Sequence, residues 1–378
     1  MNINSLNTSQ VRDTSYVQTP PTQDPPTSNN VRPNNNISQE NKTPQDNASF
    51  QNQKEEILNW KKDGHELCYH SLSQSIKSDK ESFEDFKAFK PPLEDIKTWV
   101  DHGFQPYNFS LFKKNNIAEK DFSKIIKDKN INIFWNYIDS GTATHGVINQ
   151  LNTQHFTLSS FLKGNKDFGF IKKMQLMIKN IIFHYYNDED LILKYKQTAL
   201  SFKKVFLHKK FKLLFRLISD LFKLGTSIFL VFLFWNTNKT KPYRLAKYSP
   251  IVFKHMIADK EFYIFQTLEM LDFKKSLSEK NINILIDEKG VFIAHTYFSV
   301  PMEYHTGKLF STSTTIDNKV AENFKFLAEK IKSKEIWNPT LTELVDYWSG
   351  FEKVVLDVDS NGLLFVKNDS NVIFRTFT

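Results

Sequence analysis

The chain has 378 residues, of which 40% are hydrophobic and 24% are charged, so it is long enough to bury a large core. Its single cysteine, Cys68, excludes an internal disulfide framework and a cysteine-based zinc site. The net charge of +8 comes without zinc-finger spacing, a glycine-rich phosphate loop or an RNA-binding aromatic motif, and we therefore expect no nucleic-acid partner.

Residues 1–54 are rich in Asn, Gln, Ser, Thr and Pro. Such a tract buries too little apolar surface to offset its chain entropy, and we expect it to form a disordered polar tail. No basic segment leads into an apolar stretch near the first residue, so a signal peptide is not expected. Together with the single cysteine, this predicts a cytoplasmic protein.

Apolar periodicity predicts alternating helices and strands after residue 55. In chain order, the first expected elements are a short helix around Ile57 and Trp60, a strand at 67–70, partly helical residues at 83–100 and a strand at 131–138 ended by Gly141. Helical spacing at 168–186 and 202–235 then indicates a helical insertion over 161–280.

The remaining residues are expected to return to mixed structure. The segments are strands at 282–286 and 291–298 around a turn at 288–290, a helix at 320–331, a helix opened by a capping box at 340–343, and short strands within 353–377. The alternation predicts an α/β fold, either a barrel or a wound sheet, with the helical insertion in its middle.

The most informative stretch for chemistry is Gly64-His65-Glu66, followed by His70-Ser71 and then Gln74. A strand that ends in His70 would place an imidazole at the carboxyl end of that strand, where barrel sites are built. A core histidine with a satisfied hydrogen bond is the alternative reading of His70.

This stretch resembles the second motif of the polysaccharide deacetylases, carbohydrate esterase family 4. The family motif is His-Ser/Thr-x-x-His, and both histidines bind a divalent metal, zinc or a similar ion. The resemblance implies that His70 is the first metal ligand and that Gln74 stands at the position of the second. A glutamine offers a neutral carbonyl oxygen where zinc favours an imidazole nitrogen.

Two further stretches resemble the same family. Val291–Thr296 is an apolar strand that ends in His295, similar to the late Leu-x-His motif, which implies that His295 protonates the leaving sugar oxygen or nitrogen. Trp135–Ser140 is similar to the aromatic and acidic motif that lines the groove, and this makes Asp139 a candidate catalytic residue. A lone histidine after a buried strand and a surface aspartate are the alternatives.

The chain also departs from the family pattern. No apolar strand followed by paired Asp, which supplies the base and a metal ligand, precedes Glu55, and the loop at 101–107, which contains His102, lacks the family's arginine. We expect the first strand to be missing. The resemblance then implies an incomplete or distorted (β/α) barrel of polysaccharide-deacetylase type over residues 55–378.

Two functions follow from these observations. The first is metal-dependent removal of acetyl groups from an acetylated sugar or polysaccharide precursor in surface-polysaccharide metabolism. The alternative is a catalytically inactive relative that binds a glycan or acts at a membrane surface.

Residues Leu224–Asn238 are uncharged, and Ile228–Trp235 within them is almost wholly apolar. The uncharged stretch is shorter than the about 20 residues of a spanning helix. A basic, Phe-rich flank over 203–216 precedes it. A helix of this kind can lie in an anionic membrane interface, peripheral to the inner membrane, and a buried helix of the insertion is the alternative.

Overall fold

The structure is a computed structural model that describes residues 45–70, 79–100, 117–206, 209, 211–248, 250–298, 309–312 and 315–370. The expected α/β class is confirmed, because helices surround a sheet in which most of the assigned strand pairs are parallel. The chain divides into two compact units. Unit 1 comprises residues up to Tyr137 together with 254–264 and 338–378, and unit 2 comprises 138–253 and 265–337.

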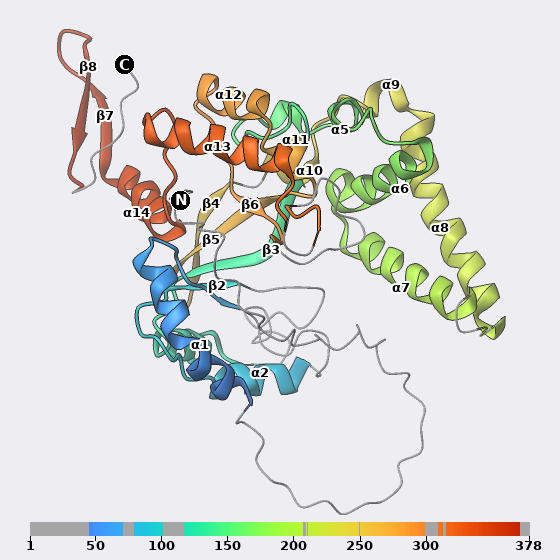
Figure 1. The fold of residues 1–378 in the computed structure, drawn as a ribbon, viewed down its shortest axis with the longest axis horizontal. Coiled ribbons are helices and arrows are strands. Elements are labelled where there is room, and N and C mark those ends of the chain that lie inside the picture. The colour runs from blue at the N-terminus through green and yellow to red at the C-terminus, as the bar shows by residue number, and fades with distance from the viewer. Residues whose placement is uncertain are drawn as a thin grey trace, which may run out of the picture. The chain divides into compact units, whose positions relative to one another are not determined.

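The sheet follows the order β1-β2-β3-β5-β4, with β6 paired to β5 (Figure 1). Its strands are β1 (Tyr69–His70), β2 (Thr98–Val100), β3 (Ile133–Thr142), β4 (Val252–Ile257), β5 (Lys260–Glu269) and β6 (Ala294–His295). β2 pairs in parallel with β1 and β3, and β5 pairs in parallel with β6. β3 and β5 begin in unit 1 and end in unit 2. The barrel expected from the sequence remains a prediction.

Unit 1 has an aromatic core between its helices and β2. The Trp99 ring is fully buried and meets the Phe86 ring at a centroid distance of 4.8 Å, and Phe122 lies behind Phe86. The helices of this unit are α1 (Gln45–Lys62), α2 (Asp79–Ala88), α4 (Glu119–Lys127) and α14 (Leu341–Gly350), followed by the hairpin β7 (Val354–Val358) and β8 (Leu364–Asn368).

Glu66 ties distant segments of unit 1 together. Its carboxylate accepts hydrogen bonds from the Thr98 hydroxyl at 2.9 Å and from the Thr342 hydroxyl and backbone N–H at 2.7 and 2.9 Å. Glu66, which lies between α1 and β1, therefore binds the first turn of α14 through Thr342. The capping box of this helix at Thr340 and Glu343 forms as predicted.

Unit 2 is mainly helical. It contains α5 (Leu158–Gly164), α6 (Phe170–Asn180), a π-helical turn η3 (Ile181–Tyr186), α7 (Glu189–Phe206), α8 (Leu214–Leu233), α9 (Trp235–Asn238), α10 (Arg244–Tyr248), α11 (Phe273–Ser276), α12 (Glu279–Asp287) and α13 (Asn318–Lys332). α7 and α8 pack side by side (Figure 1). Phe156, Met177 and Tyr243 are buried in its main apolar cluster. In the described part of the chain, no helix combines the length and apolarity needed to cross a membrane.

Several predicted elements are confirmed, among them the strand at 131–138, the helices at 168–186 and 320–331, and the C-terminal strands on either side of Asn361-Gly362. The part of the prediction beyond 370 lies outside the described residues. The predicted end at Gly141 is wrong, because β3 continues through it to Thr142. A Cβ at Gly141 would lie only 2.7 Å from a ring carbon of Phe156, so the glycine serves close packing rather than chain reversal.

The predicted strand at 282–286 is also wrong, since these residues lie in α12. The Asn281 amide donates hydrogen bonds to the carbonyl oxygens of Thr144, Lys275 and Ser276, and Ile282 is buried beside it. These contacts, of which the one with Thr144 joins residues 137 positions apart, favour the helix over the β propensity of a short Ile-rich run.

Three boundaries differ from expectation. α1 begins at Gln45, inside the tract expected to be disordered. The predicted strand at 291–298 is reduced to Ala294–His295. The expected helical insertion over 161–280 is interrupted after Tyr248 by β4 and β5, and α11 follows these strands. A single turn at Ala258-Asp259 joins β4 and β5, and Ala258 adopts a left-handed φ of 53° there.

Candidate functional site

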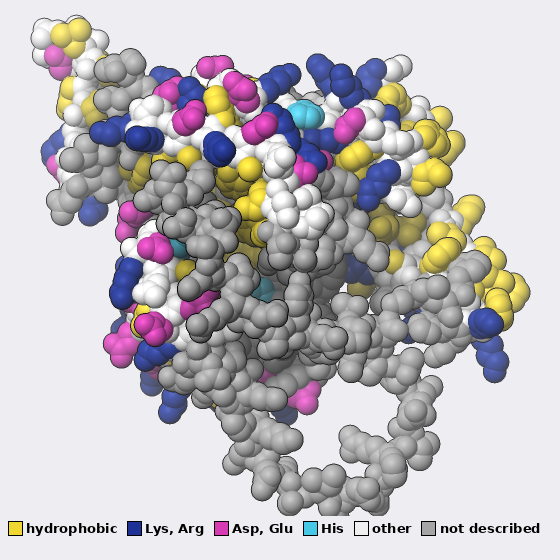
Figure 2. Space-filling view, viewed as in Figure 1, with side chains coloured by type: hydrophobic (Ala, Val, Ile, Leu, Met, Phe, Trp, Pro, Cys, Tyr) yellow, Lys and Arg dark blue, Asp and Glu magenta, His cyan; other side chains and the backbone are white. Residues whose placement is uncertain are grey.

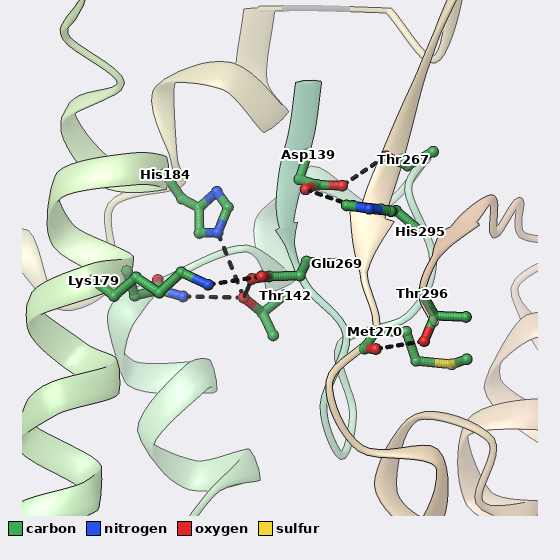
Figure 3. Close-up of polar contacts among 10 residues, drawn as sticks. Asp139, Thr142, Lys179, His184, Thr267, Glu269, Met270, His295 and Thr296 are labelled. Carbon is green, nitrogen blue, oxygen red and sulfur yellow. Dashed lines mark hydrogen bonds and ion pairs between the residues drawn. The ribbon is translucent and has the colours of Figure 1, made fainter. Parts of the chain in front are cut away.

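A group of polar and charged side chains lies where β3, β5 and β6 end, within unit 2 (Figure 3). The backbone N–H of Ala143, just after β3, donates to the carbonyl oxygen of Glu269, the last residue of β5. His295, the last residue of β6, is the register partner of Glu269. The ends of three strands therefore bring their side chains into one place.

His295 and Asp139 form the central contact of this group. Nδ1 of His295 lies 3.1 Å from Oδ2 of Asp139, and the Thr267 hydroxyl donates to Oδ1 of the same carboxylate at 2.6 Å. The side chains of His295 and Asp139 are 16% and 13% exposed, so both are largely buried. A carboxylate in this position fixes the orientation of the imidazole.

Glu269 is held by a cation from α6. Its Oε1 lies 2.7 Å from Nζ of Lys179, and the Thr142 hydroxyl lies 3.5 Å from Oε2. Burial acts to raise the pKa of Glu269, but Lys179, together with His184 and His295, outweighs it and holds this pKa below its usual value. The carboxyl group is thus an anion in the folded protein at neutral pH.

His184 completes the group from the π-helical turn η3. Its Nε2 lies 3.5 Å from the Thr142 hydroxyl, and its ring stacks on Tyr243 at a centroid distance of 5.9 Å. Burial lowers the pKa of His184 despite the nearby carboxylates of Glu269 and Asp139. A neutral imidazole therefore lies beside the anionic Glu269, and π-helical turns of this kind often occur at functional sites.

The structure brings together two of the residues singled out in the sequence, Asp139 and His295. His70 lies at the end of β1 in unit 1, where it is exposed. Gln74 and His102 lie outside the described residues. The roles of all five residues stay predictions.

The divalent metal expected from the resemblance has no complete set of ligands in the described part of the chain. Among those residues, no group of three or more His, Cys, Asp or Glu side chains is arranged to hold a metal ion. The described residues alone do not fit this cofactor. A metal at His70 stays a prediction that depends on Gln74.

Glu269, Lys179 and His184 are not among the residues predicted from the sequence. Glu269 follows Ile264-Phe265-Gln266-Thr267-Leu268, where two polar residues interrupt the apolar pattern, so its signal is weaker than the apolar run that ends in His295. Lys179 and His184 lie on an amphipathic segment, where a charged residue is usually solvent-exposed. Their part in the group follows only from the packing of α6 and η3.

Comparison of the chain with protein-family models, with curated proteins and with solved structures finds no match.

Proposed function

We propose that the chain is a hydrolase related to the polysaccharide deacetylases, which removes acetyl groups from N- or O-acetylated sugars at the site formed by His295 and Asp139. The observation that carries the proposal is the 3.1 Å contact between Nδ1 of His295 and Oδ2 of Asp139. A carboxylate that orients an imidazole through Nδ1 is an arrangement suited to proton transfer at Nε2. In this structure Nε2 of His295 is buried. His295 is the last residue of β6, and Asp139 lies three residues before the end of β3, which supports the proposal.

In this proposal His295 carries the proton transfers. Its imidazole accepts a proton from water as the water oxygen bonds to the acetyl carbonyl carbon. The imidazolium then donates that proton to the sugar oxygen or nitrogen as the bond from this atom to the carbonyl carbon breaks. Acetate and the free sugar leave. Asp139 stabilises the transient imidazolium. The proton that reaches the sugar atom therefore comes from the water molecule and passes through His295.

The substrate class is an acetylated sugar or a polysaccharide precursor, and surface-polysaccharide metabolism in the cytoplasm is the proposed setting. This part of the proposal comes from the resemblance of Val291–Thr296 and Trp135–Ser140 to the family motifs.

The proposal is tested by acetate release from acetylated chito-oligosaccharides and O-acetylated xylo-oligosaccharides, with and without added zinc. Wild type should release acetate, and His295→Gln should lower the rate by about 10²–10⁴-fold. His255→Gln, which replaces a histidine of β4 outside the site, serves as the matched control and should retain the wild-type rate.

Folded wild-type protein that releases no acetate from either substrate would contradict the hydrolase. If that protein nevertheless binds the oligosaccharides in calorimetry, and His295→Gln weakens this binding, the glycan-binding alternative takes its place.

A further inference from the structure

Helix α8 is apolar on two opposite faces. One face carries Leu217, Leu224 and Val231, which recur every seven residues and are between 1% and 5% exposed. Val231 belongs to the main apolar cluster of unit 2, and Ile228 packs against the same cluster. This face accounts for the attachment of α8 to its own unit.

The opposite face of α8 is apolar and exposed. Phe215, Phe222 and Phe229 again recur every seven residues, and their exposed fractions are 87%, 75% and 62%. Ile218 and Leu233, at 55% and 58%, lie on the same stripe by helical spacing. We call these five residues the phenylalanine stripe. At a rise of about 1.5 Å per residue, it extends for about 27 Å.

Such a stripe is unusual on a surface that faces only water. Single exposed apolar side chains are common, but a continuous apolar patch of this length usually marks a contact with a partner or a membrane. Figure 2 shows hydrophobic side chains gathered along α8, with Lys and Arg side chains near its beginning.

The charges around the phenylalanine stripe indicate what covers it. Residues 203–223 contain seven Lys or Arg residues and one acidic residue, Asp220. Asp220 lies 3.9 Å from the side chain of Arg216. Lys209, Lys212 and Lys223 are exposed, whereas no charged residue occurs from Leu224 to Asn238. The surface is therefore basic at the start of α8 and uncharged along the rest of it.

From this pattern we infer that α8 docks in the plane of an anionic membrane, with the phenylalanine stripe in the boundary between headgroups and acyl chains and the lysines on the lipid phosphates. An in-plane helix buries its apolar face about 5–10 Å deep, which Phe side chains on one stripe can reach. Basic residues next to the apolar face add electrostatic attraction to anionic lipids. The inference is independent of the proposed hydrolase activity.

The test is flotation of the full chain with vesicles of phosphatidylcholine containing 30% phosphatidylglycerol, compared with pure phosphatidylcholine. Wild type should float with the anionic vesicles at least fivefold more, and less so at 0.5 M salt. The triple variant Phe215→Ser/Phe222→Ser/Phe229→Ser should lose at least tenfold of the vesicle-bound fraction. Lys209→Gln/Lys212→Gln/Lys223→Gln should lose the preference for anionic vesicles.

Two matched controls distinguish binding through α8 from non-specific binding to vesicles. Leu356→Ser/Leu364→Ser/Val366→Ser removes apolar side chains of the β7–β8 hairpin that are 67%, 69% and 60% exposed, and it should float like wild type. Lys325→Gln/Lys332→Gln/Lys334→Gln removes three exposed lysines in or just after α13 and should also float like wild type.

Three results would overturn the inference. The first is a wild-type protein that stays out of the vesicle fraction, and the second is a phenylalanine variant that floats as well as wild type. The third is light scattering that shows wild type as a vesicle-free dimer which the phenylalanine variant converts to a monomer, since the stripe would then be an interface between two copies of the chain.

Discussion

Nδ1 of His295 lies 3.1 Å from Oδ2 of Asp139, although 156 positions separate the two residues in the sequence. The contact exists only when β3 and β6 both lie next to β5, so it reports on the folded state of unit 2. It also connects stability with the proposed chemistry, because the same hydrogen bond orients the imidazole.

Asp139→Asn should lower kcat for acetate release by about 10²–10⁴-fold, with a smaller change in KM. An amide keeps the shape of the side chain, but it cannot stabilise an imidazolium. The measurement is steady-state acetate release on the same substrate for both proteins. Asp259→Asn, in the exposed turn between β4 and β5, is the control and should leave kcat unchanged. A kcat for Asp139→Asn within twofold of the wild-type value would contradict a catalytic role for Asp139.

Lys179→Met should lower the free energy of unfolding by about 2–3 kcal/mol, because it leaves the largely buried Glu269 carboxylate without its cation. The loss is expected to be smaller than for a fully buried pair, since the Lys179 side chain is 30% exposed. Urea denaturation measures it. Lys319→Met breaks a pair that is 61% and 64% exposed, and it should change this free energy by about 0.5 kcal/mol or less. Equal losses in the two variants would contradict the expected difference between the two pairs.

Stability should fall in two steps as the solution is acidified. Burial holds the pKa of His184 below its ordinary value of 6.5. Below pH 6.5 the unfolded chain therefore binds more protons than the folded chain, and stability that is present above this pH is lost. The pKa of Glu269 lies below its ordinary 4.5, since Lys179 and the nearby histidines outweigh the effect of burial. Its contribution is therefore lost only on further acidification.

Melting temperatures of wild type between pH 8 and pH 4 check this expectation. His184→Gln should reduce the decline below pH 6.5, and His65→Gln should keep it, because His65 is exposed. Identical slopes in wild type and His184→Gln would show that this histidine does not produce the first step.

Glycine replacements should act in opposite directions at two positions. Gly141→Ala should destabilise the protein by about 1–3 kcal/mol, since its Cβ would lie 2.7 Å from the buried Phe156 ring. Gly225→Ala should stabilise it by about 0.5–1 kcal/mol, because no heavy atom lies within 4 Å of the new Cβ and alanine favours the helix. Denaturant midpoints decide both cases, and a stable Gly141→Ala protein would mean that Phe156 moves aside.

Much of the fold could be predicted from local pattern alone. The strand at 131–138 and the helices at 168–186 and 320–331 carry strong periodicity, and the capping box at Thr340 marks a helix start. α12 could not be predicted in this way, because the contacts of Asn281 with carbonyl groups of Thr144 and Lys275 are made only after folding.

In the candidate site, too, local sequence indicates some residues and not others. Asp139 and His295 each lie at or near the end of an apolar strand, so the sequence points to them one at a time. Glu269 has the same kind of position on β5, but β5 falls in a stretch whose neighbours indicate helices. The place of His184 depends on the π-helical turn after Asn180, which no local pattern specifies.

The discontinuity of unit 1 has a consequence for synthesis on the ribosome. Domains usually fold in the order in which they emerge, yet unit 1 includes residues from the first, middle and last thirds of the chain. The Glu66 carboxylate can accept its hydrogen bonds from Thr342 only after that residue is translated, 276 positions later. At about 5–20 residues per second, that interval is about 14–55 s. Unit 2 is fully translated before the last part of unit 1 appears, so the segment made first completes its contacts last.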